Sequence, residues 1–332
     1  LDWLDRAWFG ILAGRGHAHG LALFASVAVI GFLVDLPFTL YQVFVIEARF
    51  GFNKMTWRLA VADFAKQAVL AIVIGTPLLL AVLWLMSAMG ERWWLYVWLF
   101  WLAFNLLVML IYPTFIAPLF NNFLPLEDGD LKTRIEALLE RCGFANSGLF
   151  VMDGSKRSAH GNAYFTGLGR AKRIVFFDTL IQKLTPPQVE AVLAHELGHF
   201  KRRHIWKRIG MLAAVTLGLL WLLGRVIDTP WFYQGLGVAT GSTAMALILF
   251  VQVLPAFLFP LTPVASGLSR RHEFEADAYA ARHAGAGDLV AALVGLYRDN
   301  AATLTPDPLH SLFYDSHPPA SLRVARLRDC AP

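Results

Sequence analysis

Two histidines with a glutamate between them are the first residues whose spacing suggests chemistry: His195-Glu196-Leu197-Gly198-His199. On an α-helix, side chains four residues apart lie on one face, so both imidazoles can bind the same metal ion. Glu196 is offset by one residue and can reach a metal-bound water without binding the metal itself. The pattern predicts one zinc ion per chain, with Glu196 as the general base that activates water.

A solvated helix with two surface histidines is the alternative explanation of this pattern. The neighbouring apolar residues argue against it, because they give the helix a face suited to packing. These residues are Val189, Val192, Leu193, Ala194 and Leu197. We therefore expect a packed helix that binds zinc.

A catalytic zinc needs a third protein ligand and an open coordination position. His204 is nearest along the chain, but five helical steps turn it by about 140° from the preceding ligand, so we expect it at the membrane interface. Residues 271–277 are better placed, because Glu273 and Asp277 share a helix face from which Glu275 points away. We expect Glu273 to bind zinc and Asp277 to hold the second nitrogen of a ligand histidine. The alternative is that residues 271–277 form the charged, solvated start of a helix and bind no metal.

Composition indicates that these residues belong to a membrane protein. Of the 332 residues, 57% are hydrophobic and 16% are charged, and the mean hydropathy is +0.52. The net charge of +5 does not indicate nucleic-acid binding, because no basic stripe with interleaved aromatic residues occurs. Five stretches are long and apolar enough to cross a bilayer as helices. They are 21–46, 67–89, 93–118, 205–225 and 243–265, the last interrupted by Pro255, Pro260 and Pro263.

The distribution of positive charge predicts the orientation in the membrane. If all five stretches cross, the polar segments 47–66, 119–204 and 266–332 lie on one side, which holds all but four of the 29 Lys and Arg residues. Such a side is usually cytoplasmic. We therefore expect a multi-pass protein with its zinc site on the cytoplasmic side, in a bacterial inner membrane or, in a eukaryote, in the endoplasmic reticulum.

This topology divides the chain into four segments. Membrane spans and short loops occupy 1–118, and two further spans occupy 205–265. A cytoplasmic α+β segment with the zinc helix occupies 119–204, and a cytoplasmic helical segment with the third ligand occupies 266–332. An even number of crossings separates the two histidines from Glu273, so the chain returns to the side of the zinc helix.

Within the 119–204 segment, helix and strand patterns alternate. Residues 130–142 predict an amphipathic helix that ends at Gly143. Strands are predicted at 149–152, 163–165 and 174–177, with Gly167-Leu168-Gly169 as a turn between the last two. The zinc helix is predicted at 186–204, with Thr185 as its N-cap.

Several longer motifs together resemble one family. They are HELGHF at 195–200, SRRHEFEADAYA at 269–280, GSKRSAHGNAYFTG at 154–167, FVIEARFGFNKMT at 44–56 and SHPPASLRVARL at 316–327. The chain resembles the type I CAAX prenyl proteases, which are a-factor-converting integral-membrane zinc metallopeptidases. The resemblance covers nearly the whole chain and is far more specific than the histidine pair alone.

The resemblance implies a mainly α membrane protein: a multi-spanning helical bundle with a cytoplasmic α+β zinc peptidase domain of the gluzincin type. Family members have seven spans around a large water-filled chamber, whereas five are visible here, so the resemblance implies one or two spans before Leu1. The family motif assigns zinc to the positions of His195, His199 and Glu273, in agreement with their spacing. The implied substrate is a protein or peptide, with an isoprenylated CAAX protein as one possibility, cleaved near its C-terminus.

The resemblance also implies roles outside the metal ligands. His317, together with Arg323, would hydrogen-bond the oxyanion that forms during hydrolysis. Without the resemblance, the alternative is that this lone histidine before two prolines has a structural role. Asn162, Ala163 and Tyr164 resemble the family's edge strand, which would align the substrate backbone by β-addition. The alternative is that Asn162 is an ordinary turn residue with no contact to substrate.

Two other functions remain open at this point. A membrane quality-control protease of the heat-shock type would share the histidine motif and the downstream acidic pair, but it has fewer spans. A non-catalytic membrane scaffold or transporter with a structural metal would need four protein ligands. The short connection before the zinc helix, Gln182 to Pro187, suggests a bacterial homologue.

Overall fold

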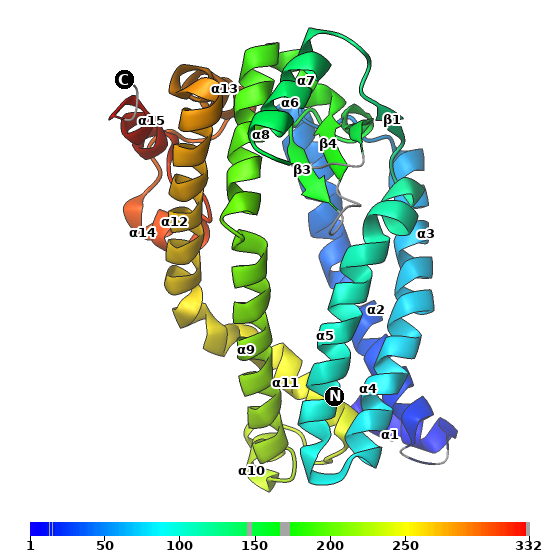
Figure 1. Cartoon of the computed structure of the whole chain (residues 1–332). Helices are drawn as coiled ribbons and strands as arrows, with labels where there is room; N and C mark the ends of the chain where they lie inside the picture. The colour runs from blue at the N-terminus through cyan, green and yellow to red at the C-terminus, as the bar shows by residue number, and fades with distance from the viewer. Residues whose placement is uncertain (13, 15, 145–147, 167–172, 330–332) are drawn as a thin grey trace. The chain divides into compact units, whose positions relative to one another are not determined.

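The computed structural model of the chain describes residues 1–12, 14, 16–144, 148–166 and 173–329 (Figure 1). Their contacts form two units. Unit 1 comprises Leu1–Arg49, Thr56–Val108 and Ile209–Phe259, and unit 2 comprises Phe50–Met55, Met109–Arg208 and Pro260–Pro332. The predicted glycine turn at 167–169 lies outside the described residues.

Unit 1 is built entirely from helices, most of them long and apolar, within the described part of the chain. They are α1 (Asp2–Leu12), α2 (His17–Tyr41), α3 (Trp57–Leu70), α4 (Thr76–Ala88), most of α5 (Trp93–Ile111) and of α9 (His204–Val226), α10 (Pro230–Gly235) and α11 (Thr243–Leu258). Among the described residues, five helical segments are long and apolar enough to cross a membrane: His17–Glu47, Trp57–Ala88, Gly90–Leu119, His204–Val226 and Thr243–Asp299. Each predicted stretch overlaps one of them, so the prediction of five candidate spans is confirmed.

Small residues allow the helices of unit 1 to approach closely. A Cβ added at Gly20 of α2 would lie 2.9 Å from Leu83 Cδ1 of α4 and 3.1 Å from Ala244 Cβ of α11. The indole of Trp98 on α5 donates a hydrogen bond to the carbonyl of Ala213 on α9 at 2.8 Å. The outer surface of this unit exposes many large apolar side chains, as expected of helices that face lipid.

The last apolar stretch is interrupted near Pro260, whereas α11 continues through Pro255. Helix α11 ends at Leu258, a 3₁₀ turn covers Phe259–Leu261, and α12 (Thr262–Ala280) begins on the far side of Pro260. Proline lacks an N–H and clashes with the preceding helical turn, which explains the break.

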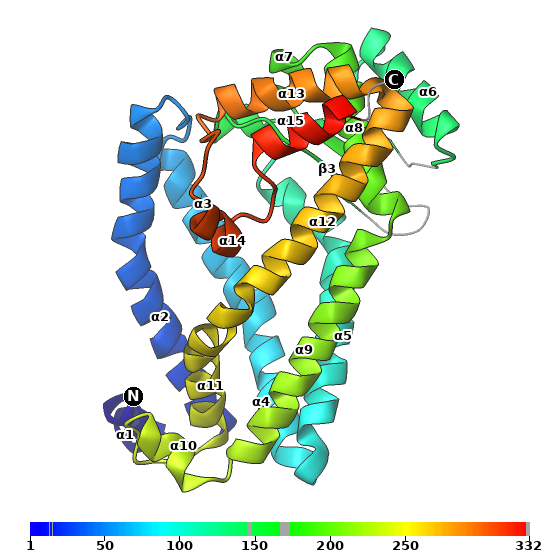
Figure 2. The same ribbon diagram turned by 90° about the vertical axis from the view of Figure 1, so that its left-hand side faces the viewer.

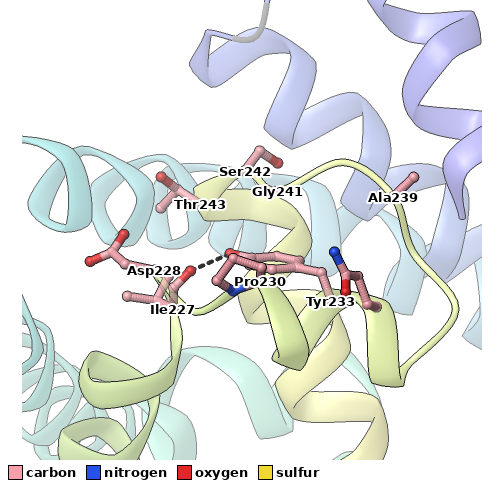
Figure 3. A pocket seen from close by; sticks show the side chains of 9 residues that line it. Ile227, Asp228, Pro230, Tyr233, Ala239, Gly241, Ser242 and Thr243 are labelled. Atoms are coloured by element: carbon pink, nitrogen blue, oxygen red, sulfur yellow. Dashed lines mark hydrogen bonds between the residues drawn. The ribbon is translucent and has the colours of Figure 1, made fainter.

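A cavity of about 500 Å³ lies in unit 1 where α9, α10 and α11 are connected (Figure 3). The hydroxyl of Tyr233 points into this region and donates a hydrogen bond to the carbonyl of Ile227 at 2.6 Å. Among the described residues that line the cavity, Asp228 alone is charged and none is a histidine or a cysteine. Its lining therefore offers too few ligands for a metal centre.

Unit 2 contains a sheet of four strands within the described part of the chain. The strands are β1 (Phe123–Pro125), β2 (Leu149–Met152), β3 (Ala163–Thr166) and β4 (Arg173–Phe177), in the spatial order β1-β2-β4-β3. Strands β2 and β4 are parallel, and the two outer pairs are antiparallel. The three predicted strands are confirmed, whereas β1 was not predicted. Strand β3 lies at an edge of the sheet.

Helix α8 (Pro186–Lys201) carries the two motif histidines and is one of several helices in unit 2 (Figures 1 and 2). The others are α6 (Asp130–Arg141), α7 (Asp178–Lys183), α12, α13 (Ala286–Asp299), α14 (Pro308–Tyr314) and α15 (Ala320–Asp329). Helix α8 contacts α6, α12, α13 and β3. Leu193, Ala194 and Leu197 are completely buried, so the expectation of a packed helix is correct.

The start of α8 is as predicted, but its end is not. Thr185 precedes the helix, and its backbone N–H donates to Gln188 Oε1 at 3.1 Å, as in a capping box. The helix ends at Lys201 rather than at 204, because Arg203 has a left-handed φ of 55° that cannot continue an α-helix. His204 begins α9, so an angle computed along one continuous helix does not place it.

Gly198 sets the distance between α8 and α12. A Cβ added there would lie 2.8 Å from Ala276 Cα and 3.0 Å from Tyr279 Cβ, which is closer than packed atoms allow. We expect Gly198→Ala to push the helices apart, to lower the free energy of unfolding by about 1–3 kcal/mol and to weaken metal binding. Thermal unfolding of the purified protein, with and without metal, would measure both effects.

Gly287 on α13 is the matched control, because a Cβ there would meet nothing within 4 Å. Gly287→Ala should be neutral or slightly stabilising, since alanine favours the helix. Equal stability of the two variants would show that close packing at Gly198 is unimportant.

Candidate metal centre

Three side chains from two helices converge in unit 2. His195 and His199 lie on α8, and Glu273 lies on α12. The two Nε2 atoms are 3.1 Å apart, and they lie 3.5 Å and 3.3 Å from the carboxylate oxygens of Glu273. Ligand atoms around a tetrahedral zinc with bonds of about 2.0–2.1 Å lie about 3.3–3.4 Å apart. Spacing and donor types therefore fit a metal ion held by two imidazoles and one carboxylate.

Contacts with three histidines keep Glu273 ionised although it is buried. Burial alone would raise the pKa of this carboxyl, but its contacts with His195, His199 and His317 hold the pKa far below the ordinary value. Burial alone would likewise lower the pKa of His195, and the hydrogen bonds to Asp277 and Glu273 raise it to about 9. A metal ion that binds His195 through Nε2 would therefore displace a proton.

Asp277 and Arg323 form a buried ion pair behind His195. Asp277 Oδ1 lies 2.9 Å from His195 Nδ1. The Arg323 guanidinium donates to Asp277 through Nε at 2.8 Å and through Nη2 at 2.6 Å. All three side chains are buried. A carboxylate on the second nitrogen fixes the tautomer and orientation of a ligand histidine, and this arrangement places Asp277 where that role requires.

Arg323 faces Asp277 and Glu273, and its expected contact with an oxyanion stays a prediction. Two of its three nitrogens face Asp277, and Nη1 is 3.7 Å from Glu273 Oε2. The side chain is 6% exposed, so it has little open surface toward a substrate. These contacts favour a role in holding Asp277 and, through it, His195.

His317 approaches Glu273 from the loop between α14 and α15. Its Nδ1 lies 2.8 Å from Glu273 Oε2, and 63% of its side chain is exposed. The structure therefore brings this histidine next to the three candidate ligands, on a side that is open to solvent. Glu196 follows His195 on α8 and is half-buried.

The predicted substrate residues lie at the start of β3, which packs against α8. Asn162 is exposed, and its carbonyl accepts a hydrogen bond from the N–H of Phe177 on β4 at 2.9 Å. Ala163 is buried and Tyr164 is half-buried. The contacts of Asn162 are thus with the sheet, and its predicted contact with substrate stays a prediction.

His204 is the residue that the sequence argument placed wrongly. Its side chain is 5% exposed, and its Nδ1 lies 3.0 Å from Nδ1 of His199, whereas the helical angle predicted that it would point away. Its Nε2 lies 3.2 Å from Oε2 of Glu275, the acidic residue that points away from the ligand face. The left-handed backbone of Arg203, which no glycine marks, turns this ring back toward the site.

Asp277→Asn tests the pair behind His195. The amide keeps the shape of the carboxylate but loses its charge, so we expect metal affinity to fall by about 10–100-fold. Competition with a chromophoric chelator would measure this change. Glu140→Gln, which alters an exposed carboxylate on α6, is the control and should bind metal as the unaltered protein does. Affinity within about twofold of the control would contradict a role for Asp277 in orienting His195.

Two family models match the chain. One, described as CAAX prenyl protease N-terminal, five membrane helices, matches residues 1–122. The other, peptidase family M48, matches residues 125–331, which include all three candidate ligands. Three of the five candidate membrane helices lie within the first matched region.

Named relatives and a solved structure agree with these matches. The chain is 40% identical over 318 residues to a CAAX prenyl protease 1 homolog of Arabidopsis thaliana, covering 93% of this chain and 73% of the relative. It is 39% identical over 326 residues to CAAX prenyl protease 1 of Saccharomyces cerevisiae, covering 93% and 72%. The crystal structure of S. mikatae Ste24p superposes with a TM-score of 0.91 at 36% identity, covering 98% of this chain and 81% of that one.

Proposed function

This chain belongs to the CAAX prenyl proteases of peptidase family M48, and on that premise we propose that it is a zinc endopeptidase that cleaves CAAX proteins near their C-terminus. It is a multi-pass membrane metallopeptidase with a protein or peptide as its substrate. The finer steps of the proposal concern the identity of the metal, the residue roles, prenylation and the side of the membrane.

The convergence of His195, His199 and Glu273 carries the proposal. Two imidazoles and one carboxylate are the ligand set of many catalytic zinc sites, and a fourth position then remains for solvent. Zinc held there would supply Lewis acidity, which lowers the pKa of a water molecule and polarises a carbonyl group.

Each nearby side chain then has a proposed role in hydrolysis. Glu196 takes a proton from the attacking water and delivers it to the leaving amine. His317 donates a hydrogen bond to the oxyanion that develops on the substrate carbonyl, a role supported by its exposed position beside Glu273. Asp277 and Arg323 hold the ring of His195 in place during these steps.

Strand β3 supports a mode of substrate binding. It is an edge strand next to α8, so an extended peptide can add to the sheet through backbone hydrogen bonds. We propose that residues 162–164 align the scissile bond in this way, with Asn162 as a further hydrogen-bonding group.

The proposed orientation places the zinc site on the cytoplasmic side. It rests on the excess of Lys and Arg in the polar segments. We propose the same four segments along the chain: spans at 1–118 and 205–265, and cytoplasmic segments at 119–204 and 266–332. Phe50–Met55 lies in unit 2. A prenylated substrate and the lipid bilayer are the proposed partners, and nucleic acid is not among them.

Cleavage-site mapping tests this function. One CAAX peptide would be offered in farnesylated and unfarnesylated forms, beside an unfolded membrane protein, with Glu196→Gln as the inactive control. The proposal predicts cleavage near the C-terminus, faster for the farnesylated peptide and absent in the control. Cleavage of the unfolded protein alone would support the quality-control alternative, and no cleavage by zinc-loaded protein would support a scaffold.

A further inference from the structure

The second nitrogen of each ligand histidine has its own polar neighbour, and the two neighbours differ. His195 Nδ1 faces the carboxylate of Asp277 at 2.9 Å. His199 Nδ1 faces Nδ1 of His204 at 3.0 Å, and His204 Nε2 faces Oε2 of Glu275 at 3.2 Å. Both paths therefore end at a carboxylate on α12, one directly and one through an additional imidazole.

The protons on these rings can be placed from the contacts. If His199 binds metal through Nε2, its Nδ1 carries the hydrogen and donates it to the lone pair of His204 Nδ1. With Nδ1 as the acceptor, the ring of His204 has its hydrogen on Nε2, which lies 3.2 Å from Oε2 of Glu275 and donates to it. Every nitrogen has a matching partner in this arrangement, and both hydrogen bonds point from the metal ligand toward the carboxylate.

Burial distinguishes this chain of contacts from an ordinary surface pair. His204 is 5% exposed, and its ring stacks on His272 at a centroid distance of 4.0 Å, which fixes its plane. Glu275 is 29% exposed and also lies 3.4 Å from Nε of Arg271, whose side chain is 77% exposed. A buried imidazole whose two nitrogens both face polar atoms is held in one orientation.

We propose that His204 and Glu275 are positioning residues that orient His199 for metal binding, as Asp277 orients His195. The proposal rests on the proposed function, because it assumes a metal ion at the three ligands. The alternating acidic residues at 273, 275 and 277 then have distinct tasks on one helix: one binds the metal, and the other two orient one histidine each.

Metal release provides a readout that does not depend on peptidase activity. His204→Phe keeps a planar ring but removes both nitrogens, and Glu275→Leu removes the final acceptor. In each variant we expect a chelator to remove zinc about 10–100-fold faster than from the unaltered protein. Glu275→Gln, whose amide oxygen still accepts a hydrogen bond, should lose less than Glu275→Leu.

Three controls separate this role from a structural one. Arg271→Gln removes only the exposed neighbour of Glu275 and should release zinc at the unaltered rate. The metal-free forms of the variants should keep the thermal midpoint of the metal-free unaltered protein, whereas a packing defect would lower it. The double variant His204→Phe, Glu275→Leu should release zinc as fast as His204→Phe alone, because both changes break one path.

Three results would overturn the proposal. Unchanged zinc release in both single variants would show that the contacts do not act on His199, while leaving the proposed function intact. Additive effects in the double variant would show that Glu275 acts independently of His204. Failure of the unaltered protein to bind zinc would overturn the proposed function and this proposal together.

Discussion

Replacing Glu196 by glutamine should leave zinc content unchanged while peptide hydrolysis falls by about 10²–10⁴-fold or more. Glutamine has nearly the shape of glutamate but cannot take a proton from the attacking water. Glu196 is not among the three converging ligands, so its substitution removes no metal bond. Metal analysis of the purified variant and hydrolysis of a CAAX peptide would provide the two measurements.

Glu136→Gln on α6 is the matched control, since it makes the same chemical change at an exposed helical position. It should hydrolyse the peptide at the unaltered rate. If Glu196→Gln and its control were equally active, another group would have to be the base. If Glu196→Gln lost zinc as well, Glu196 would be acting as a ligand or a structural residue.

Glu273→Ala is expected to abolish both stable zinc binding and hydrolysis. Glu273 is the only carboxylate in the group of three ligands identified among the described residues, and it lies 3.3–3.5 Å from both ligand nitrogens. Removing the hydrogen-bond partner of a metal ligand typically lowers metal affinity by about 10–100-fold. Glu273→Ala removes a bond to the metal itself, so its loss of affinity should exceed that of Asp277→Asn. Chelator competition on both variants would rank the two effects.

The ranking is the informative result. Equal losses for Glu273→Ala and Asp277→Asn would mean that Glu273 supports the site from outside. Full zinc binding by Glu273→Ala would remove Glu273 from the ligand set. The thermal stability of the metal-free variants would show whether either change acts by unfolding unit 2.

Much of the fold could be predicted because its signals are local. Apolar length alone identifies the five candidate spans, and short runs of apolar and aromatic residues identify β2, β3 and β4. Strand β1 spans only three residues, Phe123–Pro125, and gains its hydrogen bonds from β2, so its own sequence carries little signal. The end of α8 was missed for a related reason, because Lys201, Arg202 and Arg203 all favour a helix and the left-handed φ of Arg203 reflects its surroundings.

At the candidate site, contacts that depend on helical spacing could be predicted, whereas contacts that depend on tertiary packing could not. Helical spacing pairs His195 with His199 and Glu273 with Asp277, and the structure brings both pairs together. Sequence spacing cannot reveal that Arg323 donates two hydrogen bonds to Asp277, because the two residues meet only through tertiary packing. The position of His204 depends on the turn between α8 and α9. An angle calculated along one continuous helix therefore does not predict this position.

An anomalous-scattering map at the zinc absorption edge, from crystals of the zinc-loaded protein, tests the central claim most directly. We predict one zinc ion per chain, bound by Nε2 of His195, Nε2 of His199 and a carboxylate oxygen of Glu273 at about 2.0–2.2 Å, with solvent in the remaining position. A zinc ion bound by four protein side chains, or one that Glu273 does not contact, would contradict the account.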